Sequence, residues 1–410
     1  MGDNHDTYEV AIIGAGPAGS AAAIYLARLG AHVVLVDRAA FPRDKPCAEY
    51  LSPACEPLLR ELGVLDEVEA TAPARLRGFR IYTPNGASFR GDFAGTRDAN
   101  GHALFETGFA IPRMRLDAAL VNAARRAGVE VREGWRLAQI TRGEDGISSL
   151  TPTTGSPLTT QIVLAADGVH STIARRLRLH ATGSLRKIAL VAHMRGIAGL
   201  DDYGEVHVAG RRYVGLAPLE PMPHADLCNV AMVVDEARDG HALAGRPEAF
   251  LLSTLETFPR LRGRLAGATV VRPTLTTSRV CVRARRVVGD GLMLIGDAAG
   301  YYDPFTGEGI FHALESARLA TTTAASGLAN GDFTASALAP YARASRIAFR
   351  GKRTIERIIQ AAVQVPPLMD HLAAVMTRHP GMADTVVAVT GDYLSPAAVL
   401  RPGYLLRLVL

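Results

Sequence analysis

The feature that most constrains this chain is a glycine-rich turn between an apolar strand and a helix near the N-terminus. The apolar run Tyr8–Ile13 precedes the turn Gly14-Ala-Gly-Pro-Ala-Gly19, and the small-residue segment Ser20–Arg28 follows it. A second apolar run, His32–Val36, ends at Asp37. Strand, glycine turn, helix, strand and acid in this order predict a unit that binds a dinucleotide.

Each part of this unit has a physical reason. Gly14 permits a tight turn, Gly16 lets the backbone approach a pyrophosphate, and Gly19 lets the helix pack closely on the strand. Free N–H groups at the helix N-terminus attract phosphates, and Asp37 can accept hydrogen bonds from ribose hydroxyls. Glycines also gather in turns for steric reasons alone, so the surrounding elements carry the prediction. The predicted contacts are Gly14, Gly16, Pro17, Ala18, Gly19, Asp37 and Arg38.

Length and composition narrow the class of protein. A chain of 410 residues exceeds one ordinary core and predicts two or three domains. Hydrophobic residues at 48% and charged residues at 21% indicate a globular chain. The formal net charge of +5 is small for so large a surface, so a groove for an anionic cofactor explains it more simply than nucleic acid does. We expect no nucleic-acid partner.

The cysteines and the first residues of the chain indicate whether a metal site and a secretory signal are expected. The four cysteines are Cys47, Cys55, Cys228 and Cys281. They form no CxxC pair, so neither a zinc site nor a disulfide framework is indicated, and no metal is predicted. The start Met1–Asp6 is polar and acidic, unlike a secretory signal, and no segment is typical of a membrane span. We therefore expect a cytoplasmic protein.

Alternating strand and helix patterns run along the chain without repeats. The Asn85-Gly86 pair between two short runs predicts a hairpin. Residues from about 185 to 280 hold several alternating segments, which favour a mostly antiparallel sheet. The run Gly291–Ile295 returns to a buried strand, and residues from about 310 to 410 are largely helical in pattern, with breaks at Pro366 and Pro380.

Two further motifs follow the glycine turn. They are Ala166-Asp-Gly-Val-His-Ser-Thr-Ile-Ala-Arg175 and Gly296-Asp-Ala-Ala-Gly-Tyr-Tyr-Asp-Pro-Phe-Thr-Gly-Glu-Gly309. With three motifs in this order, the chain to about residue 330 resembles the FAD-dependent family of the para-hydroxybenzoate hydroxylase fold. That family includes aromatic hydroxylases, flavin-dependent halogenases and geranylgeranyl-reductase-like enzymes. The resemblance implies FAD as the cofactor.

The resemblance also implies the architecture. We expect an α/β protein with a Rossmann-like FAD-binding domain, an inserted and mostly antiparallel substrate-binding sheet, and a C-terminal helical region. The expected FAD-binding domain is discontinuous and comprises residues 1–75, 110–184 and 281–330. The expected substrate-binding domain comprises 76–109 and 185–280, and the helical region comprises 331–410.

The second and third motifs supply the remaining FAD contacts under this resemblance. Asp297 is expected to end a buried strand, where its carboxylate can accept from the ribityl chain. The helix that opens at Thr306–Gly309 would face the N1/C2 oxygen edge of the flavin, where the reduced ring carries negative charge. Pro304 would pack beside the reacting face. The predicted contacts here are Asp167, Gly168, Gly296, Asp297, Pro304, Gly307, Glu308 and Gly309.

Two arginines and a cysteine complete the predicted cofactor site. Arg113 matches an arginine that reaches FAD from the start of a helix in the family. Arg43 and Cys47 lie where reductases and halogenases of the family place a flavin-side loop. Cys47 could lie near the flavin ring or be a small buried hydrophobe. Pro304 and Cys47 are the candidate catalytic residues.

The source of electrons stays open. No second GxGxxG occurs, so NAD(P)H must bind transiently or a partner flavin reductase must deliver reduced flavin. Single-component hydroxylases resemble DGxxSxxR, whereas here Ala174 stands at the arginine position and Arg175 follows it. This departure matches the reductase-like branch better.

The segment Tyr213-Val-Gly-Leu-Ala-Pro218 corresponds to a block that carries tryptophans in halogenases and aromatics in prenyl reductases. Gly215 and Ala217 stand at the aromatic positions, which predicts a wider pocket and a bulkier substrate. Without the tryptophans, halogenation is not expected. The predicted pocket residues are Tyr213, Gly215, Ala217 and Pro218.

Two reactions remain open at this point. The favoured one is hydroxylation by an FAD-dependent monooxygenase, which would act on a bulky hydrophobic or aromatic substrate, free or carried by a protein, through a flavin C4a-hydroperoxide. The alternative is an FADH2-dependent reductase that saturates a carbon–carbon double bond. The arginine-rich stretch Arg346–Arg357 lies on a predicted helix and is interpreted as solvated surface arginines.

Overall fold

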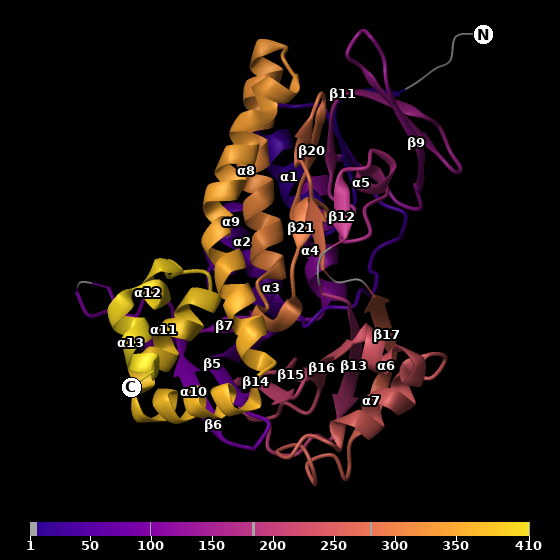
Figure 1. Cartoon of the computed structure of the whole chain (residues 1–410). Coiled ribbons are helices and arrows are strands. Elements are labelled where there is room, and N and C mark those ends of the chain that lie inside the picture. The colour runs from indigo at the N-terminus through magenta and orange to yellow at the C-terminus, as the bar shows by residue number, and fades with distance from the viewer. Residues whose placement is uncertain (1–5, 99, 183–184, 279–280, 410) are drawn as a thin grey trace.

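The computed structural model describes the chain except residues 1–5, 99, 183–184, 279–280 and 410. The start of the sequence, on which the expected compartment rests, therefore lies outside the described residues up to His5. Figure 1 shows one large sheet above a second one, with two long helices beside them and shorter C-terminal helices at the lower left. The expected α/β class, with an inserted sheet and a C-terminal helical region, is confirmed.

The first sheet is parallel at its centre. Its order is β19-β20-β11-β1-β2-β8, with the antiparallel pair β9 and β10 beside β11. Ile13 is in register with Ala165 on one side and Val36 on the other, so the carboxyl ends of three strands meet at one edge. The strands are β1 (Asp6–Ile13), β2 (Val33–Val36), β8 (Glu130–Arg132), β9 (Leu137–Arg142), β10 (Ser148–Pro152), β11 (Leu158–Ala165), β19 (Val288–Gly289) and β20 (Leu292–Leu294).

Helices cover this sheet and close its core. Small side chains at Ala21, Ala22 and Ala23 are fully buried, which lets α1 pack closely against its neighbours. A three-stranded sheet with the order β3-β7-β4 lies beside them. These elements are α1 (Pro17–Arg28), α2 (Cys55–Glu61), α3 (Leu65–Ala70), α4 (Arg113–Arg126), α8 (Gly309–Asn330), β3 (Tyr50–Leu51), β4 (Ala74–Leu76) and β7 (Gly108–Ala110).

The second sheet has the order β17-β13-β16-β15-β14-β5-β6 and is antiparallel except where β14 pairs with β5. The predicted hairpin is present, because Gly86 at its turn has φ +80 and joins β5 to β6. The strands are β5 (Gly78–Tyr82), β6 (Ser88–Asp92), β13 (Lys187–Arg195), β14 (Gly204–Ala209), β15 (Arg212–Pro218), β16 (Cys228–Asp235) and β17 (Thr269–Ser278).

Side chains alternate between the two faces of this second sheet. Leu190, Val214 and Met232 belong to a core under two helices, α6 (Glu236–Leu243) and α7 (Pro247–Leu255), which the sequence pattern did not indicate. The opposite face carries Val191, Gly215 and Ala231, which line the cavity described below. The period of two in a strand therefore separates a structural face from a pocket face.

Short elements connect the two sheets and carry the second and third motifs. Strands β12, β18 and β21 form a small sheet between them. These elements are β12 (His180–Thr182), β18 (Val282–Ala284), β21 (Gly300–Tyr301), α5 (Thr172–Arg176) and the 3-10 turns η1 (Phe93–Gly95), η2 (Gly296–Ala299) and η3 (Pro304–Thr306).

The C-terminal part is helical, as the pattern predicts. Pro366 and Pro380 each begin a helix, where a residue without an N–H donor costs nothing. The helices are α9 (Ala335–Val363), α10 (Pro366–Arg378), α11 (Pro380–Thr390), α12 (Ala397–Leu400) and α13 (Pro402–Val409). Within the described chain, no helix combines the length and apolarity needed to cross a bilayer.

Candidate cofactor and substrate site

A cavity of about 1160 Å³ runs between the two large sheets. One end lies at Asp37 and Trp135, beside the carboxyl edge of the first sheet. The cavity passes the glycine turn and reaches Pro304 and the pocket face of the second sheet. An elongated groove that opens onto an apolar sheet can hold a dinucleotide along its length and a substrate at one end.

The glycine turn packs as its sequence predicts. A Cβ on Gly19 would lie 1.8 Å from the carbonyl oxygen of Gly14, so no other residue fits there. Gly14 itself has φ +106, and a Cβ on it would lie 2.5 Å from the carbonyl oxygen of Ala166. The turn therefore brings α1 tightly against the strand ends, with the helix N-terminus facing the cavity.

Asp37 braces the turn from the second strand. Its side chain is buried, and its two carboxylate oxygens accept hydrogen bonds from the N–H groups of Ala15 and Ala39, each at 2.8 Å. Each oxygen keeps a lone pair for a ribose hydroxyl. The residue thus has a structural role that the sequence did not indicate, beside the ribose contact that the sequence predicts.

Two guanidinium groups converge on the glycine turn. A Cβ on Gly16 would lie 3.7 Å from Nη2 of Arg43 and 4.0 Å from Nη2 of Arg113. Both arginines pair with the buried Asp117, at 3.1 Å from Arg43 and 2.8 Å from Arg113. Burial lowers the pKa of Arg113, but Asp117 and the Cys47 sulfur raise it more, and the net shift is upward. Arg113 therefore stays charged in this cavity.

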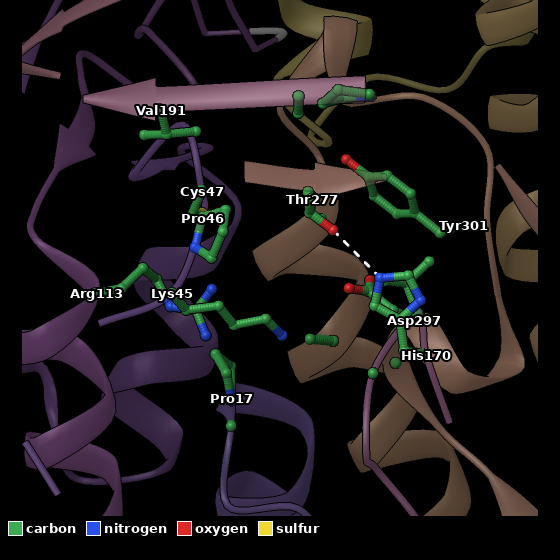
Figure 2. A pocket seen from close by; sticks show the side chains of 18 of the residues that line it. Pro17, Lys45, Pro46, Cys47, Arg113, His170, Val191, Thr277, Asp297 and Tyr301 are labelled. Atoms are coloured by element: carbon green, nitrogen blue, oxygen red, sulfur yellow. Dashed lines mark hydrogen bonds between the residues drawn. The ribbon is translucent and has the colours of Figure 1, made fainter. Parts of the chain in front are cut away.

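Lys45 is a third cation that sequence reasoning missed. Figure 2 shows its side chain extending into the cavity, above Pro17 and beside Arg113. Burial and the neighbouring Arg113 lower its pKa, against the opposing effect of Asp297. The available signal was its place in the same loop as Arg43 and Cys47. Three cations at a helix N-terminus suit the pyrophosphate of a dinucleotide.

Asp297 lines the same cavity, but its local structure differs from the prediction. Strand β20 ends at Leu294, and Asp297 lies in the 3-10 turn that follows, not at the strand end. Burial raises the pKa of its carboxyl group, while Lys45 and Arg113 lower it. Asp167 also lines the cavity, although one oxygen accepts from the N–H of Thr172 at 2.6 Å and so caps α5.

The loop Asp303–Gly309 forms the far wall of the groove. Pro304, Gly307 and Gly309 line the cavity, and Gly307 makes the turn with φ +73. Glu308 does not line it, because its carboxylate faces Lys352 of α9 at 3.8 Å. The expected contact of Glu308 with the cofactor therefore finds no support in the position of its side chain.

Asp303 anchors this loop to three other parts of the chain. Its buried carboxylate accepts from Lys187 of β13 at 2.9 Å, from the Tyr213 hydroxyl of β15 at 2.6 Å and from the Gln360 amide of α9 at 2.7 Å. The N–H of Phe305 adds a fourth hydrogen bond at 3.0 Å. Tyr213 therefore serves as an anchor as well as lining the pocket.

Cys47 lies where the groove meets the second sheet. Its sulfur accepts from the N–H of Glu49 at 3.3 Å, and its carbonyl accepts from the Asn229 amide at 2.8 Å. Figure 2 places it between Val191 of β13 and the pair Lys45 and Arg113. The sequence left open whether this thiol faces the site or the core, and the cavity lining includes it.

Glu49 holds the Cys47 loop in place. It is fully buried, with one oxygen accepting from the N–H of Arg113 at 3.0 Å and the other 2.6 Å from Nε2 of His193. His193 lies in register with Asn229 on β16 and Arg272 on β17, so three polar groups face this loop from one sheet. The loop is therefore fixed to both sheets.

Small side chains form the pocket face of the second sheet. Val191, Ala231 and Gly215 lie in one row across β13, β16 and β15. Ala189, Val233 and Ala217 extend the surface, and all six line the cavity. No aromatic side chain rises from the Gly215 and Ala217 positions, which leaves the space that the sequence predicts.

Two residues at the cavity rim also escaped sequence reasoning. Tyr301 of β21 lines the cavity next to the Pro304 loop. Nε2 of His170 lies 3.3 Å from the Thr277 hydroxyl, which joins the second motif to the end of β17. Both residues stand inside the motifs named above, His170 in the second and Tyr301 in the third, but the motif spacing did not indicate that either side chain lines the cavity.

Most of the predicted site residues therefore meet in one cavity. Gly19, Glu308 and Pro218 are the exceptions: Gly19 lies under the turn, and Pro218 follows Ala217 by one position and points to the other face. The residues that line it are Gly14, Gly16, Pro17, Ala18, Asp37, Arg38, Arg43, Cys47, Arg113, Asp167, Gly168, Tyr213, Gly215, Ala217, Gly296, Asp297, Pro304, Gly307 and Gly309.

The chain resembles several curated proteins at moderate identity. Conditioned medium factor receptor 1 of Dictyostelium discoideum is 29% identical over 336 residues, which cover 78% of this chain and 63% of that protein. The menaquinone reductase of Mycobacterium tuberculosis is 29% identical over 345 residues, 77% of this chain and 76% of the relative. A digeranylgeranylglycerophospholipid reductase of Methanoculleus marisnigri is 31% identical over 353 residues, which cover 82% of this chain and 81% of the relative.

Solved structures share the fold. A flavoprotein/dehydrogenase from Cytophaga hutchinsonii superposes with a TM-score of 0.81 at 20% identity, over 95% of this chain and 93% of that one. CmlS, a flavin-dependent halogenase, superposes with a TM-score of 0.75 at 25% identity, over 84% of this chain and 63% of CmlS.

The cavity and the comparisons agree on the cofactor. The glycine turn, the three cations beside it and the acid at Asp297 fit a dinucleotide that ends in a flavin, and the model of the FAD binding domain family matches residues 7–346. The chain therefore belongs to the FAD binding domain family and is an FAD-dependent oxidoreductase.

Proposed function

We propose that this protein is a reductase that adds two hydrogens across a carbon–carbon double bond of a hydrophobic substrate. The observation that carries the proposal is the Cys47 thiol in the cavity wall, between the FAD-side cations and the pocket face. Reduced FAD, when bound, supplies a hydride. The protein must then supply a proton to the second carbon, hold the substrate and exclude water.

Cys47 is placed to supply that proton. The Arg113 guanidinium and the N–H of Glu49 both face its sulfur, so the negative charge left after proton transfer is stabilised. The Asn229 and Glu49 contacts fix the loop that carries it. We infer that Cys47 is the acid, and that solvent returns its proton after each turnover.

The thiol also bears on the alternative reaction. An oxygen-inserting enzyme holds a strong oxidant against this wall, where an accessible thiol is open to oxidation. A reductase exposes Cys47 to no such oxidant. We therefore favour reduction over the oxygen insertion expected from the sequence, and the names of the menaquinone and digeranylgeranylglycerophospholipid reductases point the same way.

The pocket face indicates the class of substrate. Ala189, Val191, Ala231 and Val233 offer an apolar surface without a charged side chain, next to the space left at Gly215. Such a surface suits a prenylated or other lipid-soluble molecule with a bulky head. Electrons would come from NAD(P)H bound transiently or from a partner flavin reductase.

The proposal is tested by Cys47→Ser, with Cys55→Ser as the matched control because Cys55 is fully buried in the core. Each holoprotein is reduced without air and mixed with menaquinone or with a digeranylgeranylglycerophospholipid. We expect Cys47→Ser to keep FAD and to lose substrate reduction about 100-fold or more, within the range for a general acid. Equal rates for both variants would remove Cys47 from the mechanism.

Oxygen insertion remains the second candidate because one observation favours it. The open space at Gly215 and Ala217 accommodates a wide, fused-ring substrate better than a thin chain. Hydroxylation is distinguished from reduction by the product, which would gain an oxygen atom from air.

A further inference from the structure

Helix α9 carries a straight row of arginines on one side, called here the arginine face. Its members are Arg343, Arg346, Arg350, Arg353 and Arg357, and all five are exposed. They are spaced alternately by three and four residues, so at about 100° per residue they lie within roughly 80° of arc. At about 1.5 Å per residue the row is roughly 21 Å long.

The arginine face has little local counter-charge, and the acid that acts on Arg353 is Glu356 of the same helix. Within the described chain, none of its five guanidinium groups takes part in an ion pair, and the single ring contact is Arg357 over Tyr302 at 5.9 Å. Glu356 is the only acid in the sequence of α9, and it lies toward Glu308 and Asp303 on the inner side. Arg283 of β18 lies near Arg353 and adds to the positive charge.

Exposed aliphatic side chains accompany the arginines. Ile347 is 81% exposed and Ile358 is 48% exposed. They are three helical turns apart, so they flank the arginine face on the same side. Val365 and Leu368, 47% and 42% exposed, continue the apolar surface where α9 gives way to α10. The solvent-facing side of a surface helix normally carries charged and polar residues, whereas the aliphatic side chain of Ile347 is largely exposed there.

The inner side of the same helix holds the wall of the cavity. Lys352 lies about half a turn away from Arg343 in projection and faces Glu308, and Gln360 donates to Asp303. The arginine face is thus separated from the Pro304 loop by little more than one helix diameter, about 10–12 Å. Figure 1 shows α9 beside α8, on the left side of the upper part of the molecule.

We propose that the arginine face of α9 docks the protein on an anionic lipid surface, with Ile347 and Ile358 entering the headgroup region. A straight row on a convex helix touches a flat surface along its whole length, and guanidinium groups pair with lipid phosphates. An acidic protein would also complement the positive charge, but the exposed isoleucines along one edge of the arginine face favour lipid. Docking there brings the cavity close to a lipid-soluble substrate. The inference is tested without turnover, so it can fail independently of the proposed reaction.

The test is flotation of the FAD-loaded protein with vesicles of phosphatidylcholine alone or mixed with phosphatidylglycerol. We expect binding only to the phosphatidylglycerol vesicles, and weaker binding as salt is raised. The triple variant Arg346→Glu, Arg350→Glu, Arg353→Glu should bind roughly 100-fold more weakly. Ile347→Ser should weaken binding without changing its salt dependence.

The matched control is Arg238→Glu with Arg262→Glu, two exposed arginines of the substrate-sheet region. It should float like the unaltered protein, and FAD content and melting temperature show that each variant is folded. Failure of the unaltered protein to float with phosphatidylglycerol, or equal flotation of the triple variant, would overturn the proposal. Binding to poly-glutamate without flotation would overturn it too, and would assign the face to an acidic protein.

Discussion

The side-chain amide of Asn229 donates a hydrogen bond to the carbonyl oxygen of Cys47 over 2.8 Å. Asn229 belongs to the pocket face of β16, and Cys47 belongs to the loop that borders the FAD groove. The bond therefore joins the sheet face proposed to hold the substrate to the loop that carries the thiol proposed to protonate it. The proposed reaction delivers a hydride to one carbon of the double bond and a proton to the other, so the thiol and the substrate must be held in fixed positions.

The glycine turn gives the first prediction. Gly19→Ala forces a Cβ into the carbonyl oxygen of Gly14, so we expect a loss of about 1–3 kcal/mol in the free energy of unfolding and little bound FAD. Chemical denaturation and FAD content measure both. Gly267→Ala is the control, since a Cβ there meets nothing within 4 Å. Normal FAD content in Gly19→Ala would show that the turn tolerates looser packing.

Asp297 gives the second prediction, which concerns the binding of FAD. Asp297→Ala removes a carboxylate next to Lys45 and Arg113 that is placed to accept from the cofactor, and the loss of one charge-assisted hydrogen bond costs about 1.5–3 kcal/mol. We expect FAD to bind roughly 10- to 100-fold more weakly. Titration of apoprotein with FAD measures this, with the exposed Asp66→Ala as control. Retention of full yellow colour through gel filtration would contradict the assignment.

Gln360 gives the third prediction, which concerns the anchoring of the Pro304 loop. Gln360→Leu leaves the buried Asp303 carboxylate without one of its donors, and we expect a loss of about 1–3 kcal/mol in stability with weaker FAD binding. Gln364→Leu, at the residue that caps the C-terminal end of α9, removes an amide that donates to the backbone carbonyl of Gln360. Melting curves and FAD titration compare the two. Equal behaviour of both variants would mean that α9 does not hold the Pro304 loop.

Glu356 predicts a pH dependence of stability. Burial first, then Glu308 and Asp303, raise its pKa from 4.5 to about 8, against the opposing effects of Arg353 and Lys352. Between these two values the unfolded chain is ionised and the folded chain is protonated, so stability falls as pH rises through this window. Below it, both states are protonated and the effect vanishes.

Glu356→Gln should therefore raise the melting temperature most near pH 8 and hardly at all near pH 4, since the amide never ionises. Glu248→Gln, at an exposed position, serves as the control. A gain that is the same at both pH values would contradict the shifted pKa.

The sequence was sufficient for the cofactor unit because its elements are local. The turn from Gly14 to Gly19 joins adjacent elements, so spacing alone predicts its packing and a dinucleotide as its ligand, while the choice of FAD came from the resemblance of three motifs. The same holds for the hairpin at Gly86 and for the helices that begin at Pro366 and Pro380.

The sequence was not sufficient where function depends on long-range contacts. Asp303 contacts Lys187, Tyr213 and Gln360 only after three distant segments fold, and the spacing of these residues in the sequence does not predict the cluster. Glu308 was assigned to the cofactor because it stands in the Thr306–Gly309 segment of the third motif, yet its carboxylate faces Lys352 of α9. Lys45 was passed over because a single lysine in a loop carries no periodic signal.

The central claim is that bound FAD reduces a double bond with the help of Cys47. The most direct measurement is the mass of the product formed when the reduced holoprotein is mixed, in the absence of air, with menaquinone or a digeranylgeranylglycerophospholipid. We expect the flavin to be reoxidised and one of these lipids to gain two hydrogens in its isoprenoid chain, which remain after the product is exposed to air, unlike the two hydrogens of a quinol. A product that forms only in air and carries one added oxygen, or no reoxidation by either lipid, would contradict it.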